Sequence, residues 1–155
     1  MMKSRNVLKS LLALGALGLV SLARPATADA HGLPPVITGG LTTHQVDCGT
    51  LCTQGVLTGG LAGQLDFVMG TMTPTDDPNV FLYVGTNTIT TATGTLAGTD
   101  HGIWNIATGE FVDYTTFSTE TGAYAGKHGG FTITGVFDPV AGQGHSNYVA
   151  VLFPN

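Results

Sequence analysis

Basic residues are scarce in this chain, and most of them lie at its start. The 155 residues contain five Lys and Arg against ten Asp and Glu, a formal net charge of −5. Beyond residue 30 the only basic residue is Lys127, and that part of the chain has no arginine. Proteins that bind nucleic acid or an anionic membrane surface use Lys and Arg to neutralise phosphate groups. The composition therefore excludes both kinds of partner.

Apolar runs long enough to span a membrane are also lacking. The run Leu11–Ala23 has thirteen uncharged residues, whereas a membrane-spanning helix needs about 20. Basic residues precede this run, and small residues follow it up to Ala28 and Ala30. This order is typical of a cleaved secretory signal peptide. We expect residues 1–30 to be that peptide, cleaved after Ala28 or Ala30, and the protein to be secreted or periplasmic.

Strong helix formers are scarce in the rest of the chain, and glycine recurs every few residues from Gly55 onward. Short β-patterned segments stand between turn clusters such as Pro74–Asn79 and Asp138–Gly142. Sequential strands of this kind close most simply into a barrel, which has no exposed edge. We therefore predict an all-β fold for residues 55–155, a small antiparallel up-and-down β-barrel of about eight strands. A two-sheet sandwich is the alternative.

The segment 31–54 has a different character. Leu33, Pro34 and Pro35 precede a threonine-rich stretch with no clear strand pattern. We expect an extended, irregular N-terminal arm laid over the barrel. The predicted organisation is thus a signal peptide (1–30), an arm (31–54) and a barrel domain (55–155).

Cys48 and Cys52 are the only cysteines. In a straight strand their Cα atoms would lie about 13 Å apart, beyond the ~7 Å that a disulfide allows. Gly49 permits a turn, so we expect a disulfide, which would contribute about 2 kcal/mol for so short a loop. Free thiols are one alternative. A metal site with His44 at helical spacing is another, although Gly49 and the β-rich context disfavour that helix.

Three stretches carry a family resemblance: Met72–Leu82 (MTPTDDPNVFL), Gly94–Phe117 (GTLAGTDHGIWNIATGEFVDYTTF) and Thr121–Gly144 (TGAYAGKHGGFTITGVFDPVAGQG). The chain resembles secreted bacterial proteins with an allene-oxide-cyclase-like barrel. The stretch Thr121–Gly144 resembles a hairpin of that barrel that is also seen in dirigent proteins. The resemblance implies an eight-stranded antiparallel barrel with an apolar lumen, in a family that includes cyclases and small-molecule binders. Lys127 and His128 stand where that hairpin usually carries small residues. No catalytic residue of the plant cyclase can be placed on this chain.

Candidate site residues follow from strand alternation. On Glu110–Thr119 the side chains of Phe111, Asp113 and Phe117 share one face, so Asp113 would be a buried carboxyl if that face lines the lumen. His101 stands beside Asp100 and is a candidate general base, although neighbours on a strand point to opposite faces. Asp113 and His101 are the candidate catalytic residues. The candidate ligand-binding residues are aromatic: Tyr83, Trp104, Phe111, Tyr114 and Phe117.

Other kinds of chemistry find less support. The glycine-rich segment Gly122–Gly130 is flanked by strand patterns, so it predicts a β-turn or bulge and no phosphate-binding loop. No nucleophile motif surrounds Ser118 or Ser146. A copper site at His31 requires cleavage after Ala30 and a second ligand from His101, His128 or His145.

We therefore expect a secreted barrel that binds a small apolar molecule in its lumen, without a cofactor. The first alternative is a cyclase or isomerase on the same barrel. The second is a copper-dependent oxidase that uses His31.

Overall fold

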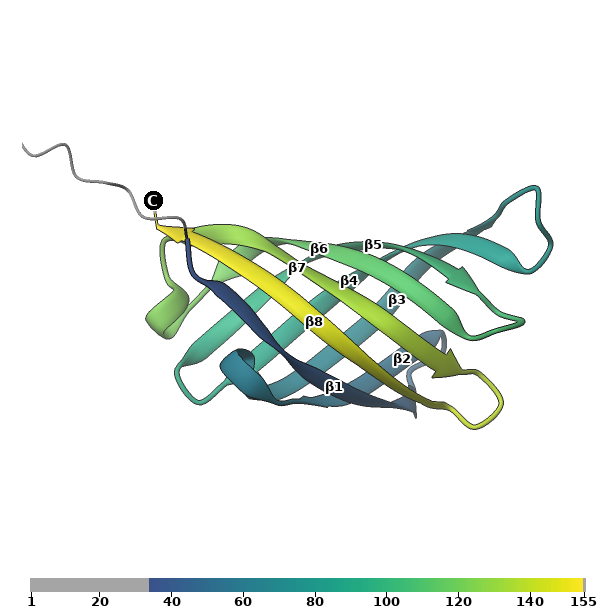
Figure 1. The fold of residues 1–155 in the computed structure, drawn as a ribbon, viewed down its shortest axis with the longest axis horizontal. Coiled ribbons are helices and arrows are strands. Elements are labelled where there is room, and N and C mark those ends of the chain that lie inside the picture. The colour runs from purple at the N-terminus through teal and green to yellow at the C-terminus, as the bar shows by residue number, and fades with distance from the viewer. Residues whose placement is uncertain (1–33, 155) are drawn as a thin grey trace, which may run out of the picture. The chain divides into compact units, whose positions relative to one another are not determined.

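A computed structural model describes residues 34–154, which form a closed barrel of eight antiparallel strands (Figure 1). Each strand pairs with its neighbours in sequence, and β1 pairs with β8. The prediction of a small up-and-down barrel is confirmed. The strands are β1 (Val36–Asp47), β2 (Leu51–Leu57), β3 (Gly63–Pro74), β4 (Val80–Thr91), β5 (Gly94–Asn105), β6 (Glu110–Glu120), β7 (Lys127–Asp138) and β8 (Gln143–Pro154).

The period-2 pattern of each strand decides which side chains face the lumen. On β6 the side chains of Asp113, Thr115 and Phe117 are buried, whereas those of Val112 and Tyr114 are exposed. Successive side chains of a strand point to opposite faces, so the buried set lines the inside of the barrel. The phenylalanine face of this strand is therefore the lumenal one.

The predicted N-terminal arm is wrong from residue 36 onward, because that segment forms β1 and the start of β2. The structure begins to describe the chain at Pro34, so His31 lies outside the described residues. β1 pairs with β2 between Leu41 and Asp47, and with β8 between Val36 and His44. Without β1 the facing edges of β2 and β8 would keep unpaired backbone N–H and C=O groups. The segment is therefore part of the sheet because it closes the barrel, although its sequence has only a weak strand pattern.

The predicted disulfide is confirmed. Cys48 and Cys52 are bonded across the turn between β1 and β2, with their Cα atoms 6.1 Å apart. Gly49 in that turn has a φ of 81°, a left-handed conformation that favours glycine. The bond rules out these two cysteines as thiolate ligands beside His44.

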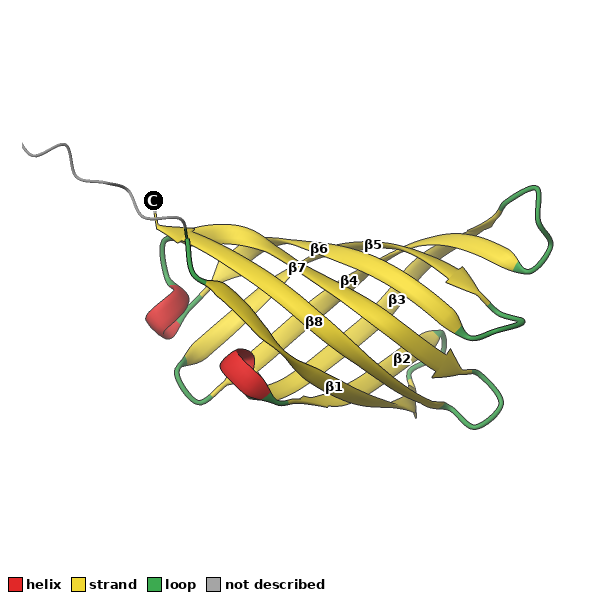
Figure 2. Ribbon diagram, viewed as in Figure 1, coloured by secondary structure: helices red, strands yellow, loops and turns green. Residues whose placement is uncertain are grey.

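Two single-turn 3-10 helices close one end of the barrel, η1 (Gly59–Leu61) between β2 and β3, and η2 (Gly122–Tyr124) between β6 and β7 (Figure 2). Leu61 and Tyr124 are buried in the barrel interior. In the part of the chain that the structure describes, no helix could cross a membrane.

The two helices repeat one local arrangement. Thr58–Gly63 (TGGLAG) and Thr121–Gly126 (TGAYAG) share their pattern, and Gly59 and Gly122 both have positive φ. The Thr58 amide donates to the Gly40 carbonyl at 2.9 Å, and the Thr121 amide donates to the Thr95 carbonyl at the same distance. The two helices with their buried side chains, which we call the plugs, thus share one local structure that occurs once in each half of the chain.

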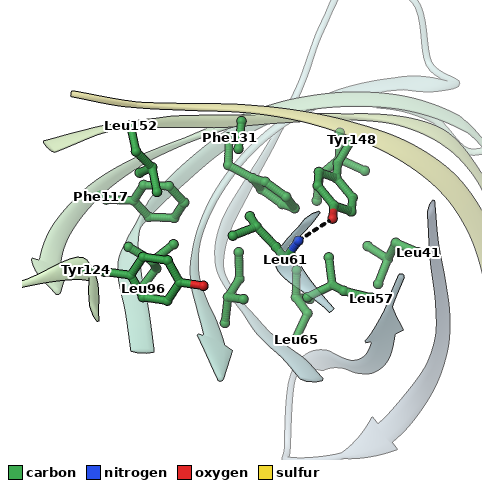
Figure 3. Close-up of a cluster of buried hydrophobic side chains, with 13 residues drawn as sticks. Leu41, Leu57, Leu61, Leu65, Leu96, Phe117, Tyr124, Phe131, Tyr148 and Leu152 are labelled. Carbon is green, nitrogen blue, oxygen red and sulfur yellow. Dashed lines mark hydrogen bonds between the residues drawn. The ribbon is translucent and has the colours of Figure 1, made fainter. Parts of the chain in front are cut away.

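The main hydrophobic core fills the lumen behind these plugs (Figure 3). The Tyr148 hydroxyl accepts a hydrogen bond from the Leu61 amide at 2.8 Å and donates to the Thr58 carbonyl at 2.7 Å. These bonds satisfy buried backbone groups of η1. The other half of the lumen is lined by a second, smaller cluster around Tyr83, Trp104 and Phe137.

Close packing between β1 and η1 predicts a sharp difference between two adjacent glycines. A Cβ at Gly39 would collide with the Thr58 carbonyl and the Tyr148 ring, whereas at Gly40 the nearest atom would be the Thr58 hydroxyl at 3.2 Å. We expect Gly39→Ala to lower the free energy of unfolding by about 1–3 kcal/mol and Gly40→Ala to change it by under about 0.5 kcal/mol. Urea denaturation measures both, and equal effects would contradict this packing.

Candidate functional site

A cavity occupies the half of the lumen away from the 3-10 plugs. It offers about 60 Å³ of space for the centre of a water-sized molecule. Its wall is mostly apolar and aromatic, and five of its buried side chains carry a polar group: Thr53, Tyr83, Asn87, Trp104 and Asp113. The remaining lining residues are Leu41, Thr43, Leu51, Leu65, Phe67, Met69, Phe111, Ile133 and Phe137.

Three adjacent strands supply most of the buried polar side chains of the lumen. β4 contributes Tyr83 and Asn87, β5 contributes Asp100, and β6 contributes Asp113 and Thr115, all of them buried. Gly102 stands between Asp100 and Trp104 on the same face of β5, and a Cβ there would collide with the Tyr83 ring. The missing side chain lets Tyr83 reach across β5 to Asp113 on β6.

Two hydrogen-bond chains hold these side chains. The Tyr83 hydroxyl donates to Asp113 Oδ2 at 3.1 Å. Asn87 Nδ2 donates to the Thr115 hydroxyl at 2.7 Å, and that hydroxyl donates to Asp100 Oδ1 at 2.8 Å. Buried polar groups are almost always hydrogen-bonded, and these chains fix the orientation of both carboxyl groups.

Four buried polar atoms have no hydrogen-bond partner within the described chain: Asn87 Oδ1, Asp100 Oδ2, Trp104 Nε1 and Asp113 Oδ1. Three of them belong to residues that line the cavity. Each buried polar atom without a partner costs about 1–3 kcal/mol. The cavity beside these residues is therefore the candidate functional site of the described chain.

The carboxyl groups have perturbed acidities. Burial, reinforced by the nearby Asp100 charge, raises the pKa of Asp113 to about 8 against the opposing effects of the Tyr83 hydroxyl and the Ile133 backbone. Burial also raises the pKa of Asp100, while hydrogen bonds and the His101 side chain oppose the rise. The pKa of the Tyr83 hydroxyl is raised by burial and then by Asp113. Asp113 can therefore hold a proton near neutral pH, which suits either hydrogen bonding to a ligand or proton transfer.

The structure brings four of the predicted site residues together. Tyr83, Trp104, Phe111 and Asp113 all line the cavity. Phe117 faces the lumen too, but it lies deeper, in the main core, with its ring 6.3 Å from that of Phe131. Its aromatic side chain packs the closed half of the barrel and does not reach the cavity.

Two of the predicted site residues lie on the outer surface, so the structure corrects their prediction as catalytic and ligand-binding residues of the cavity. His101 is exposed, and the Tyr114 ring is 48% exposed on the outer face of β6. Strand alternation explains both positions, because Asp100 and Asp113 take the inward places next to them. Neither His101 nor Tyr114 can contact a molecule in the cavity.

Sequence reasoning missed Asp100, Asn87 and Thr115. Asp100 could have been found, because Asp100, Gly102 and Trp104 alternate along one strand and so share a face. The tryptophan already indicated that this face points inward. Asn87 and Thr115 carry no such signal, because their pairing joins residues 28 positions apart.

The alternative metal sites gain no support from the described residues. Between residues 34 and 154 no group of three or more His, Cys, Asp or Glu side chains could hold a metal ion. His101, His128 and His145 are exposed on β5, β7 and β8, and His128 stacks on the Phe153 ring. His31, on which the copper hypothesis depends, lies outside the described residues.

Comparison with protein-family models, with curated proteins and with solved structures gave no match. The function therefore has to be inferred from the geometry of the cavity.

The acidity of Asp113 predicts how the stability of the fold depends on pH. Its pKa is about 8 in the folded protein against 3.8 for an ordinary Asp, so the folded state holds a proton that the unfolded state has lost. The free energy of unfolding should fall as the pH rises from about 4 to 8, by up to about 1.4 kcal/mol per pH unit from this group. Asp100 acts in the same direction.

Urea denaturation between pH 5 and pH 8 measures this slope. We expect Asp113→Asn to flatten it and the exposed Asp76→Asn to leave it unchanged. Equal slopes in the parent protein and in Asp113→Asn would show that Asp113 does not titrate in this way.

Proposed function

We propose that this barrel binds a small, largely apolar molecule in the cavity of its lumen. The observation that carries the proposal is an apolar cavity lined by Asp113 and Trp104, each of which also has one buried polar atom, Oδ1 and Nε1, without a hydrogen-bond partner in the described chain. Binding sites for small molecules combine an apolar wall with a few polar groups that orient the ligand. The filled half of the lumen provides a rigid floor for such a site.

The volume of the cavity limits the size of the ligand. A single water needs about 10–15 Å³ of such space, so about 60 Å³ holds several waters or one organic molecule of a few heavy atoms. A ligand there has to offer groups that match the polar side chains of the wall. We infer a ligand with a compact apolar body and at least one hydrogen-bonding group.

We also propose that the protein is exported and that its barrel is of the allene-oxide-cyclase-like kind. The Cys48–Cys52 disulfide supports export, because disulfides persist in oxidising compartments. The closed eight-stranded barrel supports the family assignment, as does the Thr121–Gly126 turn, whose Tyr124 side chain enters the lumen.

Native mass spectrometry of the exported protein tests binding and export together. We expect a chain that begins at Asp29 or His31, lacks the two thiol hydrogens and carries an added mass from a small molecule. Thr53→Phe should abolish the added mass by filling the cavity, whereas Thr86→Phe, on the outer face of β4, should retain it. The bare chain mass in both variants and in the parent protein would contradict lumenal binding.

Asp113 favours a second function, that of a cyclase or isomerase in which the lumen shapes a substrate and Asp113 moves a proton. A general acid or base works best with a pKa near the working pH, and the pKa of Asp113 is raised to about 8 beside open volume. The Tyr83 hydroxyl, which donates to Asp113 Oδ2, would position the carboxyl group.

The catalytic version is tested by using NMR to follow whether the protein converts the ligand that mass spectrometry identifies. Asp113→Asn keeps the shape of the side chain but cannot exchange a proton, so turnover should fall by about 10²–10⁴-fold, while Asp76→Asn retains it. Unchanged turnover in Asp113→Asn would overturn the assignment of Asp113 as the acid or base.

A further inference from the structure

We propose that the molecule taken up by this cavity is a small organic cation of the alkylammonium class, held by the Asp113 carboxylate against an aromatic wall. This inference rests on the proposed lumenal binding and adds the chemical class of the ligand. Four features of the cavity support it: an excess of acceptor atoms, the aromatic lining, the absence of lining cations and the acidic character of the chain.

The unpaired atoms of the lumen are mostly hydrogen-bond acceptors. Asn87 Oδ1 and Asp113 Oδ1 belong to residues of the cavity wall, and Asp100 Oδ2 lies in the same polar network. Trp104 Nε1 is the one unpaired donor among these buried atoms of the described chain. An ammonium group presents N–H donors on a positive centre, so a lumen with an excess of acceptors favours it over a ligand that only accepts hydrogen bonds.

The wall around Asp113 is aromatic. Phe67 and Tyr83 meet edge to face with ring centroids 5.9 Å apart, and Trp104 and Phe137 do the same at 5.9 Å. Phe111 completes the set of lining rings. The faces of such rings attract cations, and the attraction is larger where water is excluded. The aromatic wall can therefore hold both the alkyl body and the charge of an alkylammonium ion.

No side chain that lines the cavity carries a positive charge, since the lining set contains no Lys, Arg or His. Beyond residue 30 the only basic residue of the sequence is Lys127, whose ammonium group lies 5.9 Å from the centre of the Tyr124 ring at the plugged end. The carboxylate of Asp113 therefore has no cation of the cavity wall to neutralise it. The excess of acidic residues also favours the approach of cations from solution.

The groups that face Asp113 predict a pH-dependent affinity. Tyr83 faces it from β4, Asp100 from β5 and the Ile133 backbone from β7, while His101 influences Asp100 from the outer face. Without a ligand, Asp113 has a pKa of about 8 and is mostly protonated at pH 7. A cation binds the ionised form, so binding releases a proton, and the affinity rises about tenfold per pH unit at pH values well below about 8.

Two probes of nearly the same shape, tert-butylammonium and tert-butanol, separate the effect of the ligand's charge from the effect of its shape. Trp104 is the only tryptophan, so its indole N–H gives a single NMR signal that reports binding at the cavity wall. We expect tert-butylammonium to bind at least tenfold more tightly than tert-butanol at pH 9. Its affinity should fall by about fivefold between pH 8 and pH 7 and by about tenfold between pH 7 and pH 6.

Two variants provide the controls. Asp113→Asn should lose the preference for the cation and its pH dependence, whereas the exposed Asp76→Asn, which removes the same charge from the surface, should retain both. If the two probes bind equally, or the alcohol binds more tightly, the ligand is not a cation, although lumenal binding stands. If neither probe shifts the Trp104 signal at any pH, the cavity does not take up small molecules and both proposals fail.

Discussion

The pairing of β1 with β8 is the constraint on which the rest of the structure depends. It joins the first strand to the last and removes the two edges that an open sheet would leave. Closure also creates an interior in which alternate side chains of all eight strands lose contact with water. The desolvation of Asp100 and Asp113, and with it every chemical property of the cavity, follows from this pairing.

The two ends of the lumen are built on different principles. At the plugged end, η1 and η2 repeat one arrangement of threonine, glycine and a buried side chain, and the space behind them is filled with apolar residues. At the other end the repetition stops. The buried carboxyl groups lie on β5 and β6, whereas β1 and β2 present Leu41, Thr43 and Thr53 to the cavity. This asymmetry concentrates polar chemistry in one half of a barrel whose other half serves stability.

Local patterns were sufficient to predict most of the strands and to place Asp113 on one face of β6 with Phe111, but they left open whether that face lines the lumen. They failed for β1, because its place in the barrel is decided by partners about a hundred residues away on β8. They also could not reveal the contact between Asn87 and Thr115, which depends on strand register. A register shift at Ala97–Gly98 changes the pairing of β5 with β6, and no residue type announces it. Phe117 was correctly placed on the same face as Asp113, but its depth in the barrel depends on the same register.

A buried carboxyl group is costly for the fold unless it is used. With its pKa raised to about 8, Asp113 makes the folded state less stable as the pH rises through neutrality, and an apolar residue of similar size would remove that penalty. The surrounding structure keeps the carboxyl in place. Tyr83 donates to one oxygen, Gly102 leaves room for the Tyr83 ring, and the other oxygen is buried without a partner in the described chain. Functional sites are where proteins sacrifice stability in this way, and this cost is the reason to test Asp113 before any other residue of the lumen.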